Sequence, residues 1–133
     1  MRVSDHLAGR SPETRRLYRS ILAAVRRVGP VRVDPQGRGI AFQVRARSIG
    51  VMFRRDSIDL GLWLKHPIRD ARVTRVEEFG ALGRAYHFPI RRPEDLDAAL
   101  LQLVRQAYAV GAQEVPTIRR APASADARRR AGA

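Results

Sequence analysis

The side chains best suited to bind a ligand are basic and aromatic residues that alternate with apolar residues over positions 43 to 87. Successive side chains of an extended backbone point to opposite faces, so these residues are expected to share the polar face of a sheet. Arginine donates forked hydrogen bonds to carboxylates and phosphates, and tryptophan can stack on a flat molecule or on a guanidinium group. The candidate ligand-binding residues are Gln43, Arg45, Arg47, Arg54, Trp63, Lys65 and His87, and Asp59 falls on the same face. The alternative is a solvated face, with Trp63 packed under a loop or against a second copy of the chain.

The same sequence predicts no catalytic site, no metal site and no cofactor. His6, His66 and His87 are far apart and match no ligand spacing, and the chain has no cysteine to supply a thiolate. Glu77 and Glu78 are adjacent on a predicted strand and therefore point in opposite directions. An imidazole on a polar sheet face can act as a base, but no nucleophile or partner acid is evident for His87. We therefore expect binding rather than catalysis.

The strands that position these residues come from the centre of the chain. Apolar residues alternate over positions 40 to 46, and the alternation restarts one residue out of phase at Ile49. Keeping one face buried requires a tight turn or a bulge near Arg47 to Gly50. Asp56-Ser57 then separates this region from a third alternating run over positions 58 to 64, which is typical of antiparallel neighbours.

Helices are predicted on both sides of the strands. Ser11-Pro12-Glu13 can begin a helix, which Gly29-Pro30 ends. Arg92-Pro93-Glu94-Asp95 can begin a second helix, which Gly111 ends. The remaining predicted elements are a short edge strand near Val31 to Val33, an imperfectly alternating strand over 72–79, a glycine turn over 80–83 and a strand over 85–90.

Together these elements predict an α+β fold. It is a two-layer sandwich with an N-terminal helix, about five mainly antiparallel strands and a C-terminal helix. Both helices are expected on one face of the sheet, which leaves the polar face open. Residues 1–112 form the predicted domain, whereas residues 113–133 are rich in Arg, Ala and Pro and lack an apolar period, which predicts a disordered tail.

The net charge of +13 on 133 residues makes nucleic acid a candidate partner, because arginine neutralises phosphate. Composition weakens this inference. Lys65 is the sole lysine among 26 basic residues and asparagine is missing, a bias that GC-rich coding produces without selection for a partner. The chain has no apolar leader and no apolar run of membrane-spanning length, so we expect a cytoplasmic protein that does not bind membranes.

Several short segments, in order and spacing, resemble a bacterial family, the domain-of-unknown-function family 5655. They are His6-Leu7-Ala8-Gly9, Val28-Gly29-Pro30, Ile40-Ala41-Phe42-Gln43, Leu60-Gly61-Leu62-Trp63-Leu64, Arg75-Val76, His87, Glu94-Asp95-Leu96-Asp97 and Ala107-Tyr108. The resemblance covers about His6 to Tyr108 and leaves out the arginine-rich tail. It implies a small module, found alone or attached to other domains, with no settled activity.

Two functions fit these observations. The first is a non-enzymatic binding module that holds an anionic small molecule or an acidic peptide on the open basic sheet face. The alternative is a sequence-independent nucleic-acid-binding accessory protein, which uses the arginine-rich surface and tail. A homodimer through the open face would instead turn that face into an interface. The tail residues of the nucleic-acid hypothesis are Arg119, Arg120, Arg128, Arg129 and Arg130.

Overall fold

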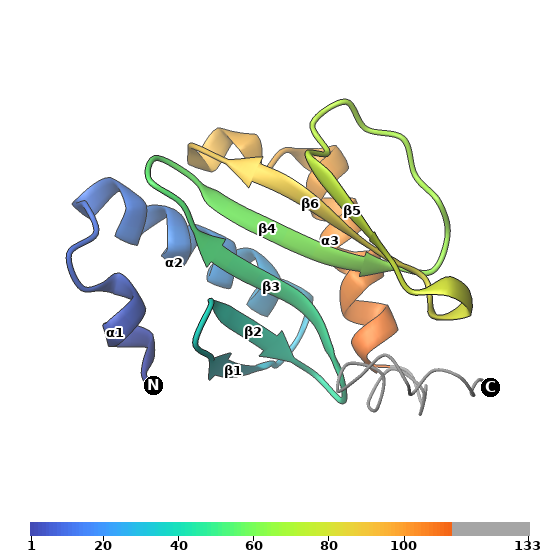
Figure 1. Ribbon diagram of the computed structural model, residues 1–133, viewed down its shortest axis with the longest axis horizontal. Coiled ribbons are helices and arrows are strands. Elements are labelled where there is room, and N and C mark those ends of the chain that lie inside the picture. Colours follow the sequence, from blue (N-terminus) through green and yellow to red (C-terminus); the bar gives the residue numbers. More distant parts are fainter. Residues whose placement is uncertain (113–133) are drawn as a thin grey trace.

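The alternating apolar residues form one antiparallel sheet in the computed structural model, which describes residues 1–112. The strands lie side by side in the order β1-β2-β3-β4-β6-β5 (Figure 1). Their bounds are β1 Arg32–Pro35, β2 Ile40–Gln43, β3 Arg47–Phe53, β4 Ile58–Leu64, β5 Arg75–Glu78 and β6 Arg84–Ile90. The last two strands exchange places relative to the chain order, so β6 lies between β4 and the edge strand β5.

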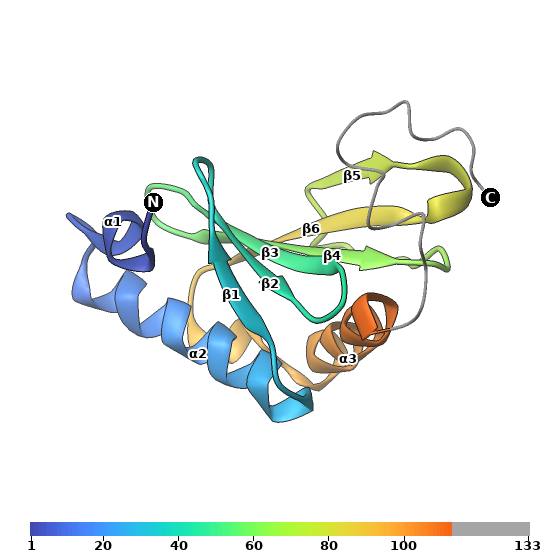
Figure 2. The same ribbon diagram turned by 90° about the horizontal axis from the view of Figure 1, so that it is seen from below.

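Two long helices cover one face of this sheet. Helix α2, Pro12–Val28, begins where the sequence predicts, with the Ser11 hydroxyl accepting a hydrogen bond of 3.1 Å from the Thr14 amide. Helix α3, Ala98–Ala112, closes the described chain. Figure 2 shows α2 and α3 on the same side of the sheet. A five-residue helix that the sequence did not predict, α1 over Val3–Leu7, precedes α2.

The core lies between the helices and the sheet. The fully buried side chains of the sheet point toward the helices from alternate positions of the central strands, and each helix adds an apolar stripe to the same layer. The largest are Phe42, Phe88, Ile40, Ile58, Leu60, Leu62, Leu64 and Ile90 from the sheet, with Ile21 from α2 and Leu100 from α3. The predicted α+β fold and the shared helix face are therefore confirmed, with six strands where about five were expected.

Two predicted boundaries were wrong. The break between the first two central strands lies at residues 44–46, ahead of the expected Arg47 to Gly50, and the strand register shifts between Phe42 and Gln43. The amides of Arg45 and Ala46 donate to the Gly111 carbonyl, each at 3.0 Å, so the docking of α3 fixes where the chain turns.

The second helix also begins later than predicted. Residues Pro93–Asp95 form only a 3-10 turn, and α3 starts at Ala98 after Asp97 accepts a hydrogen bond of 2.9 Å from the Leu100 amide. A proline at position 93 and a capping aspartate at position 97 can each mark the start of a helix, and the sequence alone does not separate them. Gly111 lies within α3, which continues to Ala112.

Candidate functional site

His87 is the centre of a charged cluster on the face of the sheet that the helices leave open. It lies on β6, between Asp59 of β4 and Glu77 of β5. Its Nδ1 lies 3.2 Å from each carboxylate oxygen of Asp59, and its Nε2 lies 2.8 Å from Oε1 of Glu77. His87 is 9% exposed and Asp59 is 8% exposed, so both side chains are buried although they lie on the face of the sheet that the helices leave open.

This geometry favours the doubly protonated form of the imidazole. A carboxylate only accepts hydrogen bonds, so a ring with a carboxylate at each nitrogen is satisfied only when both nitrogens carry a proton. The hydrogen bond with Asp59 raises the pKa of His87 above its ordinary value. Burial acts in the opposite direction, and the hydrogen bond with Glu77 adds to the increase.

The two carboxylates of the cluster are held differently. Burial alone would raise the pKa of Asp59, but the hydrogen bond and charge of His87, together with the nearby guanidinium groups, lower it below the usual value. Those groups belong to Arg54, whose Nη2 lies 3.5 Å from Asp59, and to Arg75, whose Nη2 lies 4.0 Å away. The Glu77 side chain is 44% exposed and lies on an edge strand. Asp59 is therefore the fixed partner of the imidazole, and Glu77 is the partner with room to move.

A line of small residues leads across the sheet away from His87. Strand register places Gly61 beside His87, Gly50 beside Gly61, and Ala41 beside Gly50. Because these positions carry little or no side chain, the sheet surface is recessed there. The result is a shallow depression of about 340 Å³, which we call the open-face hollow. Its lining includes Arg38, Arg47, Met52, Trp63 and Ala85, with Asp59, Glu77 and His87 at one end.

Trp63 forms part of the wall of the open-face hollow. Its ring stacks on Phe79 with centroids 4.4 Å apart, and its Nε1 donates a hydrogen bond of 2.7 Å to the Leu82 carbonyl. One face of the indole is thus covered by the segment between β5 and β6. The contacts fix the ring, so Trp63 can present a rigid apolar edge to a bound molecule.

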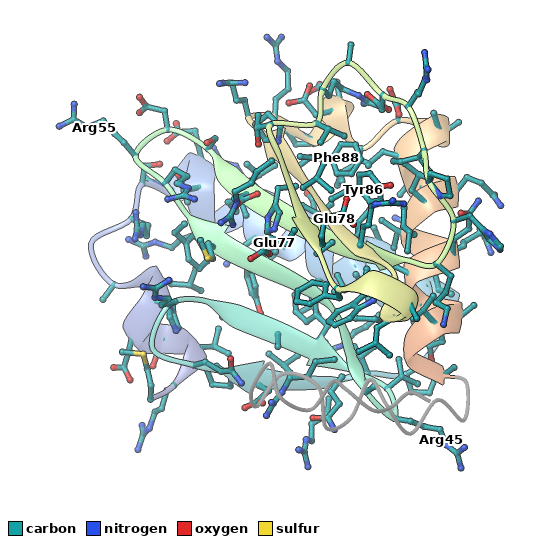
Figure 3. The ribbon with its side chains drawn as sticks, turned by 45° about the vertical axis from the view of Figure 1, so that its right-hand side comes forward. Arg45, Arg55, Glu77, Glu78, Tyr86 and Phe88 are labelled. Carbon is teal, nitrogen blue, oxygen red and sulfur yellow. The ribbon has the colours of Figure 1, made fainter. Side chains whose placement is uncertain are left out.

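The seven residues predicted from sequence divide into three groups. Arg47, Trp63 and His87 line the open-face hollow, and Arg54 reaches it through Asp59. Gln43 pairs instead with Arg32 at the β1 edge. The remaining two, Arg45 in the turn after β2 and Lys65 beyond the end of β4, are outside its lining. Figure 3 shows Arg45 at the periphery of the molecule, far from Glu77. The five tail arginines lie outside the described residues.

Three residues of the cluster were not among the seven candidate ligand-binding residues predicted from sequence. Asp59 was placed on the correct face but was not connected to His87, because the β4–β6 pairing joins positions 28 residues apart. Glu77 and Glu78 do point in opposite directions: Glu77 meets His87, and Glu78 pairs with Arg84 at 2.7 Å. Arg75 lies directly opposite His87 in the β5–β6 register. Alternation along each strand shows which sheet face these side chains occupy, and it could have identified them once the order of the last two strands is known.

The cluster does not converge on a point where a metal ion could bind. Asp59 and Glu77 approach opposite nitrogens of the His87 ring, so their oxygens face the ring rather than each other. Within residues 1–112, no group of three or more histidine, aspartate or glutamate side chains could hold a metal ion. In the same part of the chain, no helix is both long and apolar enough to cross a bilayer.

Fold and site together define a small α+β module with a charged hollow on an uncovered antiparallel sheet. The chain belongs to the family described as a domain of unknown function, DUF5655, whose model matches residues 3–111. Searches of curated proteins and of solved structures found no match to the chain.

Proposed function

We propose that the chain is a binding module that holds a small anionic ligand, or an acidic side chain of a peptide, in the open-face hollow. The observation that carries this proposal is the position of His87. Its imidazolium is held by a buried carboxylate at Nδ1, while Nε2 meets the partly exposed Glu77 carboxylate at the end of a recess floored by glycine and alanine. A fixed donor at the end of an apolar recess suits a molecule with a flat body and one anionic group.

The charges around the hollow favour an anion at either end. At the His87 end, the imidazolium and two arginines face two carboxylates, Asp59 and Glu77. At the opposite end, Arg38 and Arg47 line the hollow, and Asp34, which Nε of Arg47 contacts at 2.9 Å, is the one carboxylate of the described chain that pairs with either of them. Each end therefore keeps one positive charge in excess.

Glu77 indicates which chemical group of a ligand can bind to the imidazolium. Its carboxylate already occupies Nε2 of His87, in the position that the carboxylate of a ligand would take. The Glu77 side chain is partly exposed, so it can be displaced without opening the core. A ligand carboxylate or phosphate would replace one charge-assisted hydrogen bond with another and gain contact with the apolar floor.

The side chains that line the hollow favour binding over catalysis. Ser48 is the one hydroxyl among the described lining residues, and its Oγ donates a buried hydrogen bond of 2.6 Å to the Ala107 carbonyl. A hydroxyl held in this way is directed at α3 and is not presented to a ligand. The imidazole accordingly has no nucleophile to activate among these residues.

Binding of benzoate and phenyl phosphate, compared with neutral benzamide, tests the proposal. Fluorescence of Trp63 reports on the wall of the recess and the imidazole NMR signals of His87 report on its charged end, and Trp63 is the sole tryptophan of the chain. We expect both anions to perturb both signals at pH 6, and benzamide to bind at least about tenfold more weakly, since hydrogen bonds to charged groups contribute about 1.5–3 kcal/mol.

The matched variants are His87→Gln and His66→Gln, because His66 is exposed and lies outside the lining. His87→Gln should abolish the preference for anions, and His66→Gln should preserve it. Equal binding of benzoate and benzamide, or an unchanged preference in His87→Gln, would show the proposal to be wrong.

A further inference from the structure

The helix layer carries a second basic surface, on the opposite side of the molecule from the open-face hollow. Every charged residue of α2 after Glu13 is an arginine, and all five are exposed: Arg15, Arg16, Arg19, Arg26 and Arg27. Glu13 approaches Arg16 at 3.8 Å, but both side chains are largely solvated. An exposed ion pair of this kind contributes little, so the surface of α2 remains strongly positive.

Part of this surface is a groove rather than a flat face. A recess of about 490 Å³ runs between α2 and the chain from Pro93 to Leu101. Ala23, Ala24 and Leu96 contribute to its apolar lining. Arg16, Arg19 and Arg27 line the same recess, and the helical rise spreads them over about 16 Å of the α2 axis.

Two of the three arginines of this groove are not neutralised within the described chain. The side chains of Arg19 and Arg27 make no hydrogen bond and no ion pair with any residue from 1 to 112. Arg19 also lies three residues from Arg16 and four from Arg15, and like charges at these spacings destabilise a helix by about 0.2–0.5 kcal/mol per pair. An external polyanion would relieve this repulsion.

We propose that the α2 groove binds the phosphodiester backbone of a nucleic acid without reading its sequence. A nucleic acid strand carries one phosphate about every 3.4 Å along its axis, so each guanidinium of a row about 16 Å long finds a phosphate within reach. The guanidinium fork matches phosphate oxygens, and the described lining offers alanine, leucine and proline beside the arginines, with Ser20 as its one uncharged polar side chain. Such a surface holds the backbone and carries little means of base readout.

The test compares two double variants of the full chain. Arg19→Gln with Arg27→Gln removes two charges from the groove. Arg55→Gln with Arg69→Gln removes two charges from exposed loop residues that likewise make no ion pair in the described region. Glutamine has nearly the helix propensity of arginine, so the groove variant should fold, and the loop variant changes only exposed loop residues. Circular dichroism checks the folding of both. Fluorescence anisotropy measures binding of a labelled single strand and of a labelled duplex across a salt series.

The groove variant should bind at least one oligonucleotide about tenfold more weakly than the unaltered chain, with a salt slope smaller by about two, one for each lost phosphate contact. The loop variant should lose less than about twofold. The inference fails if neither oligonucleotide binds near physiological salt, if both variants lose affinity equally, or if polyglutamate competes as well as an oligonucleotide. Benzoate binding should survive in the groove variant, so the outcome is independent of the proposed function of the hollow.

Discussion

Gly61 lies beside His87 in the β4–β6 register, so closely that a Cβ at position 61 would stand 3.1 Å from the imidazole Cε1. The missing side chain leaves the space in which the ring lies flat against the sheet. In this position the ring reaches Asp59 on the same strand as Gly61 and Glu77 on the far edge strand. The cluster thus depends on a residue that contributes no functional group.

Gly61→Ala should disturb the cluster, whereas Gly50→Ala should not. A Cβ at Gly61 pushes the imidazole away from Asp59, so the pKa of His87 should fall toward its ordinary value and stability should drop by about 1 kcal/mol. A Cβ at Gly50 would lie 3.5 Å from the Ile40 carbonyl, which is ordinary contact. NMR titration of His87 and urea unfolding of both variants check this, and an unchanged His87 pKa in Gly61→Ala would contradict it.

The cluster should make stability depend on pH in two directions. The folded pKa of His87 is raised, so its contribution is complete below the unfolded value of about 6.5 and disappears as the pH rises through the folded value. The pKa of Asp59 is lowered, so its contribution is complete above about 3.9 and disappears as the pH falls through the folded value. Both contributions to stability are therefore complete between about pH 4 and 6.5.

Urea unfolding at pH 5.5 and pH 9 measures the His87 contribution. The unaltered chain should lose stability between these values, by about 1.4 kcal/mol for each unit by which folding raises the pKa. His87→Gln should remove most of this difference. An equal loss in the variant would assign the pH dependence to other groups.

Gly111→Ala should destabilise the fold even though alanine favours helices. Gly111 lies inside α3 where the helix crosses the turn after β2, and a Cβ there would stand 2.9 Å from the Ala46 carbonyl and 2.5 Å from Ser48 Oγ. Overpacking at such a contact costs about 1–3 kcal/mol, more than the gain of about 1 kcal/mol in helix propensity. Gly37→Ala, where nothing lies within 4 Å of the new Cβ, is the control and should be neutral or slightly stabilising. Thermal unfolding of both variants decides the matter.

Local patterns in the sequence predicted the elements of this fold better than their connections. The start of α2 is encoded locally, by the hydroxyl of Ser11 and the proline that follows it. Alternation over 58–64 likewise shows which side chains of β4 face the core. The turn at 44–46 depends on amides bonded to Gly111, about 65 residues away, and no local pattern encodes that contact.

In the candidate site, too, the sequence predicted single residues better than the contacts between them. The phase of the strands identified His87, Trp63 and Arg47 as residues of the open face, and these three do line one hollow. The partners of His87 depend on β6 lying between β4 and β5, which is a consequence of strand order. Arg45 was misplaced because it was assigned to a continuing strand, whereas the chain turns there to meet α3.

Glu77→Gln should strengthen binding of benzoate, while Glu78→Gln should leave it unchanged. In the unaltered chain the Glu77 carboxylate competes with a ligand for Nε2 of His87. Because the Glu77 side chain is partly solvated, its pair with His87 contributes about 1 kcal/mol, which corresponds to a gain of about fivefold in affinity. Glu78 is the neighbouring acid on the same strand, but it pairs with Arg84 and lies outside the lining of the hollow.

The gain in Glu77→Gln should depend on pH, because Glu77 also helps to raise the pKa of His87. Without it the imidazole loses its second proton at a lower pH, so the stronger binding should be evident at pH 5.5 and should fade toward neutral pH sooner than in the unaltered chain. Isothermal titration calorimetry with benzoate at pH 5.5 and at neutral pH, on both variants, measures the effect. Weaker binding by Glu77→Gln at pH 5.5 would mean that Glu77 contributes to the site as a ligand-binding group and does not compete with the ligand.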